Sequence, residues 1–309
     1  MSSTTDKRNR RRGKKKSKLW NIVIYHRKCS DGTASAWCFK KRYPNIISIP
    51  LECGSKEIPE YMLKILEKAK NKNVVFVDIT LSVDDTKKVK QMIDNGKIMI
   101  IDHHITAVPV MKIKEIDRSI YNVNKSAAQL AWDYCFPDKE RPKFINYIAD
   151  RDLWKWNMPD SKVYNNGLFK LFGTSFETYD MLYEYENQLY DTIVKVGSKD
   201  QKEKDEKIDI LVKDIKPTKW KDYKVAVIEL DRPDQYLRSE VGHKLCQLHD
   251  IQFAIICCYR DDYKEHWISL RSQGDFDTTT VSEPYGGGGH KNASGFTWTK
   301  ELKKLFSDD

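Results

Sequence analysis

The residues best suited to chemistry are the consecutive Asp102, His103 and His104, which follow the apolar run 97–101. A run of this length and composition predicts a buried strand. The carboxyl end of a parallel strand opens onto the crevice where α/β sheets bind ligands. Carboxylate and imidazole together suit a divalent cation such as manganese. The triplet therefore predicts a metal-dependent site at the edge of a sheet.

Two earlier apolar runs end in the same way. His26 closes the run 19–25 and is followed by Asp31, while Asp78 follows the run 74–77. If the three strands are neighbours, their polar ends converge, and so many carboxylates would repel one another without a cation. Each residue alone also fits a purely structural role, since an Asp at the end of a strand is often a turn former or helix cap. Together they predict a metal site in which Asp78 bridges paired ions.

Paired divalent ions with hard ligands promote hydrolysis in two ways. They lower the pKa of a bound water to give a hydroxide, and they hold the oxygens of a phosphoryl group during in-line displacement. Phosphoester hydrolysis is the reaction that follows from such a site.

A second cluster lies near the end of the chain, where four consecutive glycines precede His290. Bare backbone N–H groups form an anion-binding nest, and His290 can donate to a phosphate. Arg271, at the end of another apolar run, suits bidentate phosphate recognition. A glycine run is also typical of a flexible linker, but the strand-like residues 296–298 that follow favour a binding loop. The glycines assigned to it are Gly287, Gly288 and Gly289.

Apolar runs and amphipathic helices alternate through the first part of the chain. This predicts an α/β fold with a doubly wound parallel sheet in the N-terminal domain. The pattern turns helical after residue 126, and strand signals return at 223, which predicts a helical extension and then a smaller α/β C-terminal domain. We expect domains over 19–196 and 219–309, joined by a charged linker at 197–218. That charged stretch fits a solvated helix face equally well.

These motifs together resemble the DHH phosphoesterase superfamily with its DHH-associated C-terminal domain, and the likeness runs from about residue 20 to 298. The resemblance implies a hydrolase that uses one or two manganese ions, with magnesium as an alternative. It also implies that the C-terminal domain holds the substrate against the metals. The metal ligands it implies are His26, Asp31, Asp78, His103 and Asp150, with Asp152 as second choice for the last. It assigns proton transfer or phosphate contact to His104, ligation or orientation to Asp102, and the terminal phosphate to Arg271, the glycines and His290.

The first motif departs from the family pattern, which has two aspartates separated by one residue. Here either Cys29 stands in the first position or Thr33 stands in the second. The small residues after Asp31 favour Cys29. A thiolate is a soft ligand for manganese, so one metal position is expected to be weakened or lost, unless Cys29 simply packs.

The net charge of +9 is concentrated in a tail. Residues 1–18 contain nine Lys or Arg and one acidic residue, and the remainder contains 45 basic and 44 acidic residues. We expect this tail to be disordered, with residues 7–18 contacting nucleic-acid phosphates, addressing the nucleus, or only adding solubility. Seven cysteines without a CxxC pair indicate an intracellular protein with reduced thiols. No apolar stretch approaches the roughly 20 residues of a membrane helix.

The leading interpretation is a phosphodiesterase that acts on short single-stranded oligonucleotides or small nucleotides. The alternatives are a binding module weakened by the incomplete first motif, and a small phosphoester or pyrophosphate hydrolase. The nearly neutral body argues against tracking long duplex DNA.

Overall fold

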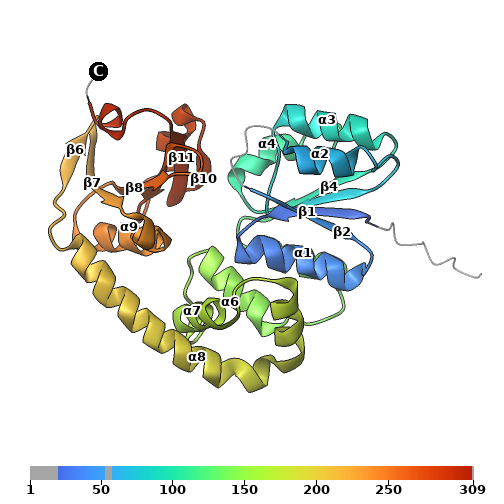
Figure 1. The fold of residues 1–309 in the computed structure, drawn as a ribbon, viewed down its shortest axis with the longest axis horizontal. Coiled ribbons are helices and arrows are strands. Elements are labelled where there is room, and N and C mark those ends of the chain that lie inside the picture. The colour runs from blue at the N-terminus through green and yellow to red at the C-terminus, as the bar shows by residue number, and fades with distance from the viewer. Residues whose placement is uncertain (1–19, 53–57, 308–309) are drawn as a thin grey trace, which may run out of the picture.

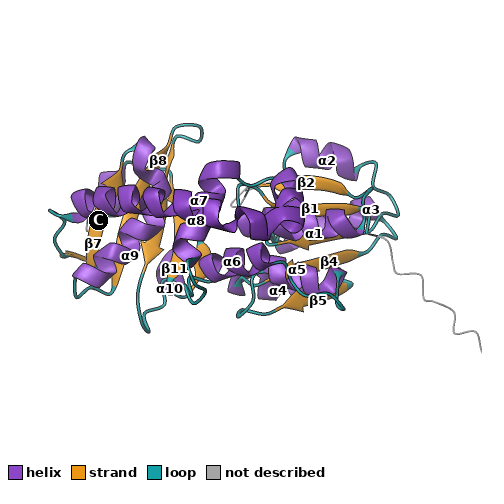
Figure 2. Cartoon of the chain, turned by 90° about the horizontal axis from the view of Figure 1, so that it is seen from below, coloured by secondary structure: helices purple, strands orange, loops and turns teal. Residues whose placement is uncertain are grey.

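The computed structural model describes residues 20–52 and 58–307, so the expectations for the basic tail lie outside the described residues. Two sheets stand apart from one another, and the long helix α8 connects the helices that follow the first sheet to the second sheet (Figure 1). Seen from below, α8 extends from the helical region in the middle of the molecule to beneath the second sheet (Figure 2). None of the helices in the described part of the chain is long and apolar enough to cross a membrane.

The first sheet is five-stranded and parallel throughout, with the order β2-β1-β3-β4-β5. Its strands are β1 (Ile22–His26), β2 (Ile47–Leu51), β3 (Val74–Val77), β4 (Ile98–Asp102) and β5 (Arg118–Tyr121). The central strands β3 and β4 are buried along their whole length, because helices cover both faces of a doubly wound sheet.

Alternate residues of each strand enter different cores. Val75 and Met99 pack with Trp37 on the face covered by α1 (Ser30–Arg42) and α5 (Ala127–Cys135). Phe76 and Ile100 pack on the opposite face, beneath α2 (Glu60–Leu66) and α3 (Val83–Ile93). The period of two along a strand accounts for this division.

The helical extension consists of α6 (Lys143–Asp152), α7 (Ser161–Phe172) and α8 (Phe176–Val212), with a kink at Tyr185. Helices α7 and α8 lie in backbone contact, since a Cβ on Gly167 would come within 1.9 Å of the Ile193 carbonyl oxygen. Residues 197–212 continue α8 as regular helix. The domain limits given above stay a prediction.

The second sheet is six-stranded and mixed, with the order β10-β11-β9-β8-β7-β6. Only β7 and β8 pair in parallel. Its strands are β6 (Thr218–Trp220), β7 (Tyr223–Leu230), β8 (Phe253–Arg260), β9 (Glu265–Arg271), β10 (Gly288–His290) and β11 (Ala293–Trp298). Helix α9 (Arg238–Leu248) covers one face over a separate core. The expected fold class, a parallel α/β sheet followed by a smaller α/β domain, is confirmed.

The remaining elements are short helices. They are η1 (Ile105–Ala107), α4 (Val108–Met111), η2 (Arg232–Leu237), α10 (Thr279–Ser282), η3 (Glu283–Tyr285) and η4 (Leu302–Leu305). Of these, η1 lies directly after the Asp-His-His triplet and contacts β10 of the second sheet.

Candidate active site

The carboxyl ends of three adjacent strands supply the centre of the site. His26 is the last residue of β1, Asp78 follows β3, and Asp102 ends β4. Because β1, β3 and β4 are neighbours and parallel, their ends meet at one edge of the sheet. The convergence inferred from the apolar runs is therefore present in the structure.

Asp78 lies at the middle of this cluster. Its Oδ1 is 3.3 Å from His103 Nε2, and its Oδ2 is 3.3 Å from His26 Nδ1. The residue is 2% exposed and has a φ of 58°, a left-handed conformation that Asp tolerates better than most residues. Burial would raise the pKa of Asp78, but the imidazoles of His103 and His26 hold it well below its usual range.

His103 is fully buried among three carboxylates. Its Nε2 lies 3.3 Å from Asp78, 3.3 Å from Asp152 and 3.8 Å from Asp31. Burial opposes a charge on the ring, but the contact with Asp78 and the other two carboxylates raise the pKa of His103 to about 10. The three carboxylates around this one imidazole make the site suitable for a cation.

Asp31 connects the site to helix α5. Its two oxygens accept hydrogen bonds from the backbone N–H groups of Ala127 (2.7 Å) and Ala128 (3.0 Å), at the start of that helix. Burial and the carboxylates of Asp152 and Asp78 raise the pKa of Asp31 well above its ordinary value. Each oxygen keeps a lone pair, so this capping role leaves Asp31 able to bind metal.

The structure places Asp152, and not Asp150, against His103. The two oxygens of Asp150 accept from the backbone N–H groups of Asn157 (3.0 Å) and Met158 (3.1 Å). Asp150 therefore shapes the loop after α6, while Asp152, two residues later on the helix, turns toward the site. Metal binding by either residue stays a prediction, and Asp152 takes the place of Asp150 in the ligand set that we propose below.

Asp102 orients the second histidine of the triplet. Its Oδ1 lies 2.7 Å from His104 Nδ1 and also accepts from the backbone N–H of His103, while Thr80 donates to its Oδ2. With Nδ1 donating to Asp102, Nε2 of His104 is left for a substrate atom. Burial lowers the pKa of His104, but Asp102 outweighs it, so that the pKa is raised overall.

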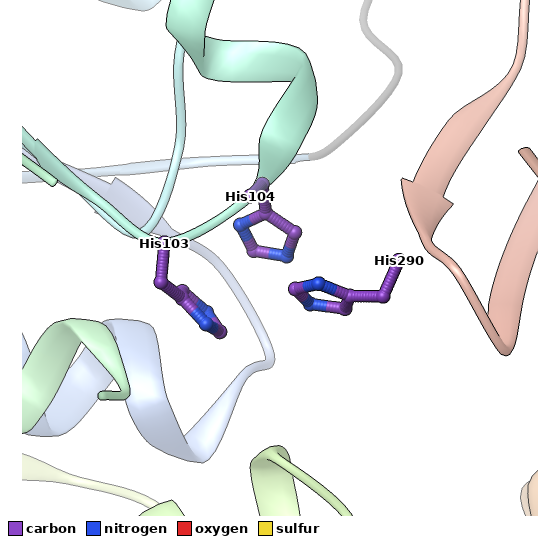
Figure 3. Close-up of side chains that lie close together, drawn as sticks. All are labelled: His103, His104 and His290. Atoms are coloured by element: carbon purple, nitrogen blue, oxygen red, sulfur yellow. The ribbon is translucent and has the colours of Figure 1, made fainter. Parts of the chain in front are cut away.

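His290 reaches the triplet from the second sheet. Its ring stacks on His104 with a centroid distance of 4.6 Å and lies 5.1 Å from His103 (Figure 3). Burial and the two neighbouring imidazoles lower the pKa of His290 to about 3. The ring is therefore neutral at physiological pH and can donate one hydrogen bond to an anion.

The glycine run brings β10 close to the first domain. A Cβ on Gly288 would come within 2.8 Å of Thr106 Cγ2 in η1. Gly289 has a φ of 143°, and a Cβ on Gly287 would come within 2.2 Å of the Gly295 carbonyl oxygen. These contacts account for the glycines without an anion, and anion binding by Gly287, Gly288 and Gly289 stays a prediction.

Arg271 does not join the histidine cluster. Its guanidinium donates to the Leu270 carbonyl oxygen and to Ser239 Oγ, both at 2.8 Å. Its side chain also lies under α9, where a Cβ on Gly242 would touch it. Burial lowers the pKa of Arg271 to about 10, so it stays charged. A role for Arg271 in phosphate binding stays a prediction.

The first motif presents Cys29 to the site. The Thr33 hydroxyl donates to the Cys29 carbonyl oxygen, whereas Cys29 Sγ lies within 4.8 Å of ligand atoms of His26 and Asp78. This contact favours the interpretation in which Cys29 takes the place of a carboxylate of the family pattern, and that interpretation stays a prediction. Burial, and then the nearby Asp78, raises the pKa of the Cys29 thiol, so the free thiol keeps its proton.

These residues fit divalent metal ions. Both oxygens of Asp78, both ring nitrogens of His103 and Oδ2 of Asp152 are buried without a hydrogen-bond partner in the described structure. Buried polar atoms are normally satisfied, and a cation would satisfy these. Carboxylate and imidazole donors also match such ions. Residue types and strand ends identified most of this set, but no sequence signal marked Thr80 or Thr106.

The chain is similar to two curated proteins, although no family model matches it. It is 32% identical over 301 residues to the uncharacterized protein R106 of Acanthamoeba polyphaga mimivirus, covering 90% of this chain and 68% of that one. It is 24% identical over 276 residues to the oligoribonuclease NrnB of Bacillus subtilis, covering 78% of this chain and 64% of that one. The chain thus spans about two thirds of these relatives.

A crystal structure of RecJ from Thermus thermophilus in complex with Mn²⁺ shares the fold. Its TM-score is 0.50 at 13% identity, and the match covers 93% of this chain and 50% of RecJ. The fold and the site together define a metal-dependent phosphoesterase. The chain belongs to the DHH phosphoesterase superfamily, as do the oligoribonuclease and RecJ.

Proposed function

We propose that this protein is a manganese-dependent phosphodiesterase that releases mononucleotides from short single-stranded oligonucleotides, with magnesium as an alternative ion. The observation that carries the proposal is the set of buried, unpartnered atoms of Asp78, His103 and Asp152 opposite the His104–His290 pair. The similarity to an oligoribonuclease supports a nucleic-acid substrate. Six unpaired cysteines in the described part of the chain support an intracellular location.

The proposed metal ligands are His26, Asp31, Asp78, His103 and Asp152, with Cys29 beside them. When bound, divalent ions would supply a nucleophilic hydroxide and neutralise charge on the phosphoryl oxygens. His104, fixed by Asp102, would in its protonated form donate the Nε2 proton to the oxygen of the leaving nucleotide. Neutral His290 would donate to a phosphate oxygen, and the β10 backbone would limit the space around it.

The test is release of nucleotide from a 5′-phosphorylated diribonucleotide with Mn²⁺ present. We expect turnover that a chelator abolishes and that Mn²⁺ restores. His104→Ala should lower kcat by about 10²–10⁴-fold, the usual contribution of a positioned proton-transfer group. Absence of turnover with Mn²⁺ or Mg²⁺, on this substrate and on longer oligoribonucleotides, would contradict the proposal.

The position of Cys29 favours one second candidate, a nucleic-acid-binding module that has lost turnover. Binding of the diribonucleotide without hydrolysis under either metal would support it. Hydrolysis of pyrophosphate in the same assay, without hydrolysis of the diribonucleotide, would instead indicate a small phosphoester hydrolase.

A further inference from the structure

A cavity of about 330 Å³ is lined in part by the residue that precedes Asp152 in the sequence. Arg151 lines the cavity, while the next residue, Asp152, contacts His103. Trp154 and Trp156 form one wall from the loop after α6, and His243 on α9 forms part of another. The cavity therefore lies between the helical extension and α9 of the second domain, and it shares the end of α6 with the metal cluster.

The two tryptophans are held in unusual backbone conformations. Trp154 has a φ of 54° and Trp156 a φ of 52°, and bulky residues rarely adopt positive φ. Strain of this kind concentrates at functional sites, where the surrounding structure enforces it. Here Asp150 holds the loop in this conformation. Its carbonyl oxygen accepts from Lys155 N (2.8 Å), and its carboxylate accepts from the backbone N–H groups of Asn157 and Met158.

The aromatic rings of the cavity wall contact one another edge to face. Trp154 packs edge-on against Trp156 at 4.9 Å and against His243 at 5.6 Å between ring centroids. Burial, together with Lys162 and Arg271, lowers the pKa of His243, so this ring is neutral. The indole Nε1 of Trp156 is buried and has no hydrogen-bond partner in the described structure. Such a donor is costly to leave unpaired and would be satisfied by an acceptor on a ligand.

Charged side chains complete the cavity, and its lining includes the basic residues Arg151, Lys162 and Lys244 and the acidic residues Asp205, Asp209 and Glu240. Lys162 Nζ lies over the Trp156 ring at 5.4 Å from its centroid, and the exposed Arg151 side chain has no ion-pair partner among residues 20–52 and 58–307. Aromatic faces beside cations are the usual means of binding single-stranded nucleic acid, because every base can stack.

We propose that this cavity binds the base of one nucleotide of the substrate while the adjoining phosphodiester lies at the metal cluster. The inference rests on the proposed function, which names short oligonucleotides as the substrate. It adds a base-binding site that a substrate as short as a dinucleotide can fill. Trp154 and Trp156 supply stacking, the Trp156 indole donates to the base, and Arg151 and Lys162 balance phosphate charge.

The test compares intact and abasic substrates. Loss of stacking on one base is worth about 1–3 kcal/mol, so Trp154→Ala should lower kcat/KM for a diribonucleotide about 5- to 150-fold. We expect no such loss on one of the two dinucleotides that carry an abasic residue, and that substrate identifies which base enters the cavity. Trp156→Phe keeps the stacking and should show only the smaller loss due to the missing donor.

Phe169→Ala is the matched control, since Phe169 is an exposed aromatic residue of α7 that does not line the cavity. Circular dichroism establishes that each variant folds. An equal loss on intact and on both abasic substrates, or no loss with Trp154→Ala, would overturn the proposal.

A second readout separates this inference from the proposed function. Calorimetric titration of the diribonucleotide into metal-free protein in chelator measures binding without turnover. Weaker binding by Trp154→Ala than by Phe169→Ala supports the base site, even if the wild type shows no hydrolysis and the proposed function fails. Equal binding by these two variants would contradict the base site, even if the wild type is an active phosphodiesterase.

Discussion

At the scale of single residues, Asp150 and Asp152 have different tasks although they are two positions apart on α6. Asp150 accepts four backbone hydrogen bonds from the following loop through its carboxylate and carbonyl groups, counting a long one from Trp156 N at 3.5 Å. Asp152 has an unpartnered buried oxygen 3.3 Å from His103. One carboxylate stabilises the loop, and the other is available to a metal.

Exchange of each carboxylate for an amide separates these tasks. Asp150→Asn puts an NH₂ group against a backbone N–H and should lower the free energy of unfolding by about 1–3 kcal/mol. Asp152→Asn should leave the metal-free protein as stable as the wild type but weaken Mn²⁺ binding by at least about tenfold. Urea unfolding in chelator and Mn²⁺ titration measure the two effects. The reverse pattern would return Asp150 to the ligand set.

Cys29 gives the second prediction at this scale. A carboxylate is a harder ligand than a buried thiol that keeps its proton, so Cys29→Asp should strengthen Mn²⁺ binding by about tenfold or more and raise the rate of hydrolysis. Cys29→Ser, of similar size and without a carboxylate, is the control. If Asp and Ser at this position behave alike in a Mn²⁺ titration, Cys29 only packs and does not limit the metal site.

At the scale of elements, the apolar strands and their polar ends could be predicted from the sequence, because a parallel strand buried on both faces is a continuous hydrophobic run. β5 could not, since Arg118–Tyr121 contains one apolar aliphatic residue and lies at the edge of the sheet. Nor could α7, whose existence depends on backbone contact with α8 at Gly167. The choice between Asp150 and Asp152 depends on how the loop after α6 folds back, which residue types do not encode.

The contact between α7 and α8 also gives a pH-dependent prediction. Tyr164 donates to Glu186 Oε1 at 2.8 Å, and burial raises the pKa of Glu186 to about 6. The folded state therefore favours the protonated acid, and the stability this gives is present at pH 4 and is lost as the pH rises through 6.

Glu186→Gln should accordingly stabilise the protein more at pH 8 than at pH 4.5, by about 1–2 kcal/mol. Denaturant unfolding at the two pH values measures the difference. Glu184→Gln, on the exposed side of the same helix, is the control. A gain that is the same at both pH values would show that Glu186 does not titrate as its surroundings indicate.

At the scale of the whole molecule, the site is shared by two domains. His290 comes from the second sheet and stacks on His104 of the first, and the cavity at Trp154 is closed by α9. The sequence predicted that the glycine loop would face the metal cluster. It could not predict the direction of Arg271, because that depends on how α9 packs over β9.

The contact between Gly288 and Thr106 tests this arrangement in solution. Gly288→Ala would bring a methyl group within 2.8 Å of Thr106 Cγ2, and we expect kcat/KM for a diribonucleotide to fall by about tenfold, since small displacements of a substrate-positioning group cost this much or more. Thr106→Ser removes that methyl group and should restore activity in the double variant. Equal loss in the single and double variants would show that the two residues do not meet.

The most direct test of the account is Mn²⁺ uptake by the wild type and by Asp78→Asn, measured by equilibrium dialysis with metal analysis. Asn keeps the shape of Asp78 and accepts its positive φ, while it removes the charge at the centre of the cluster. We predict that the wild type takes up one or two ions saturably and that the folded variant binds at least about 100-fold more weakly. Equal uptake by both proteins, or none by the wild type, would contradict a divalent metal centre at the ends of β1, β3 and β4.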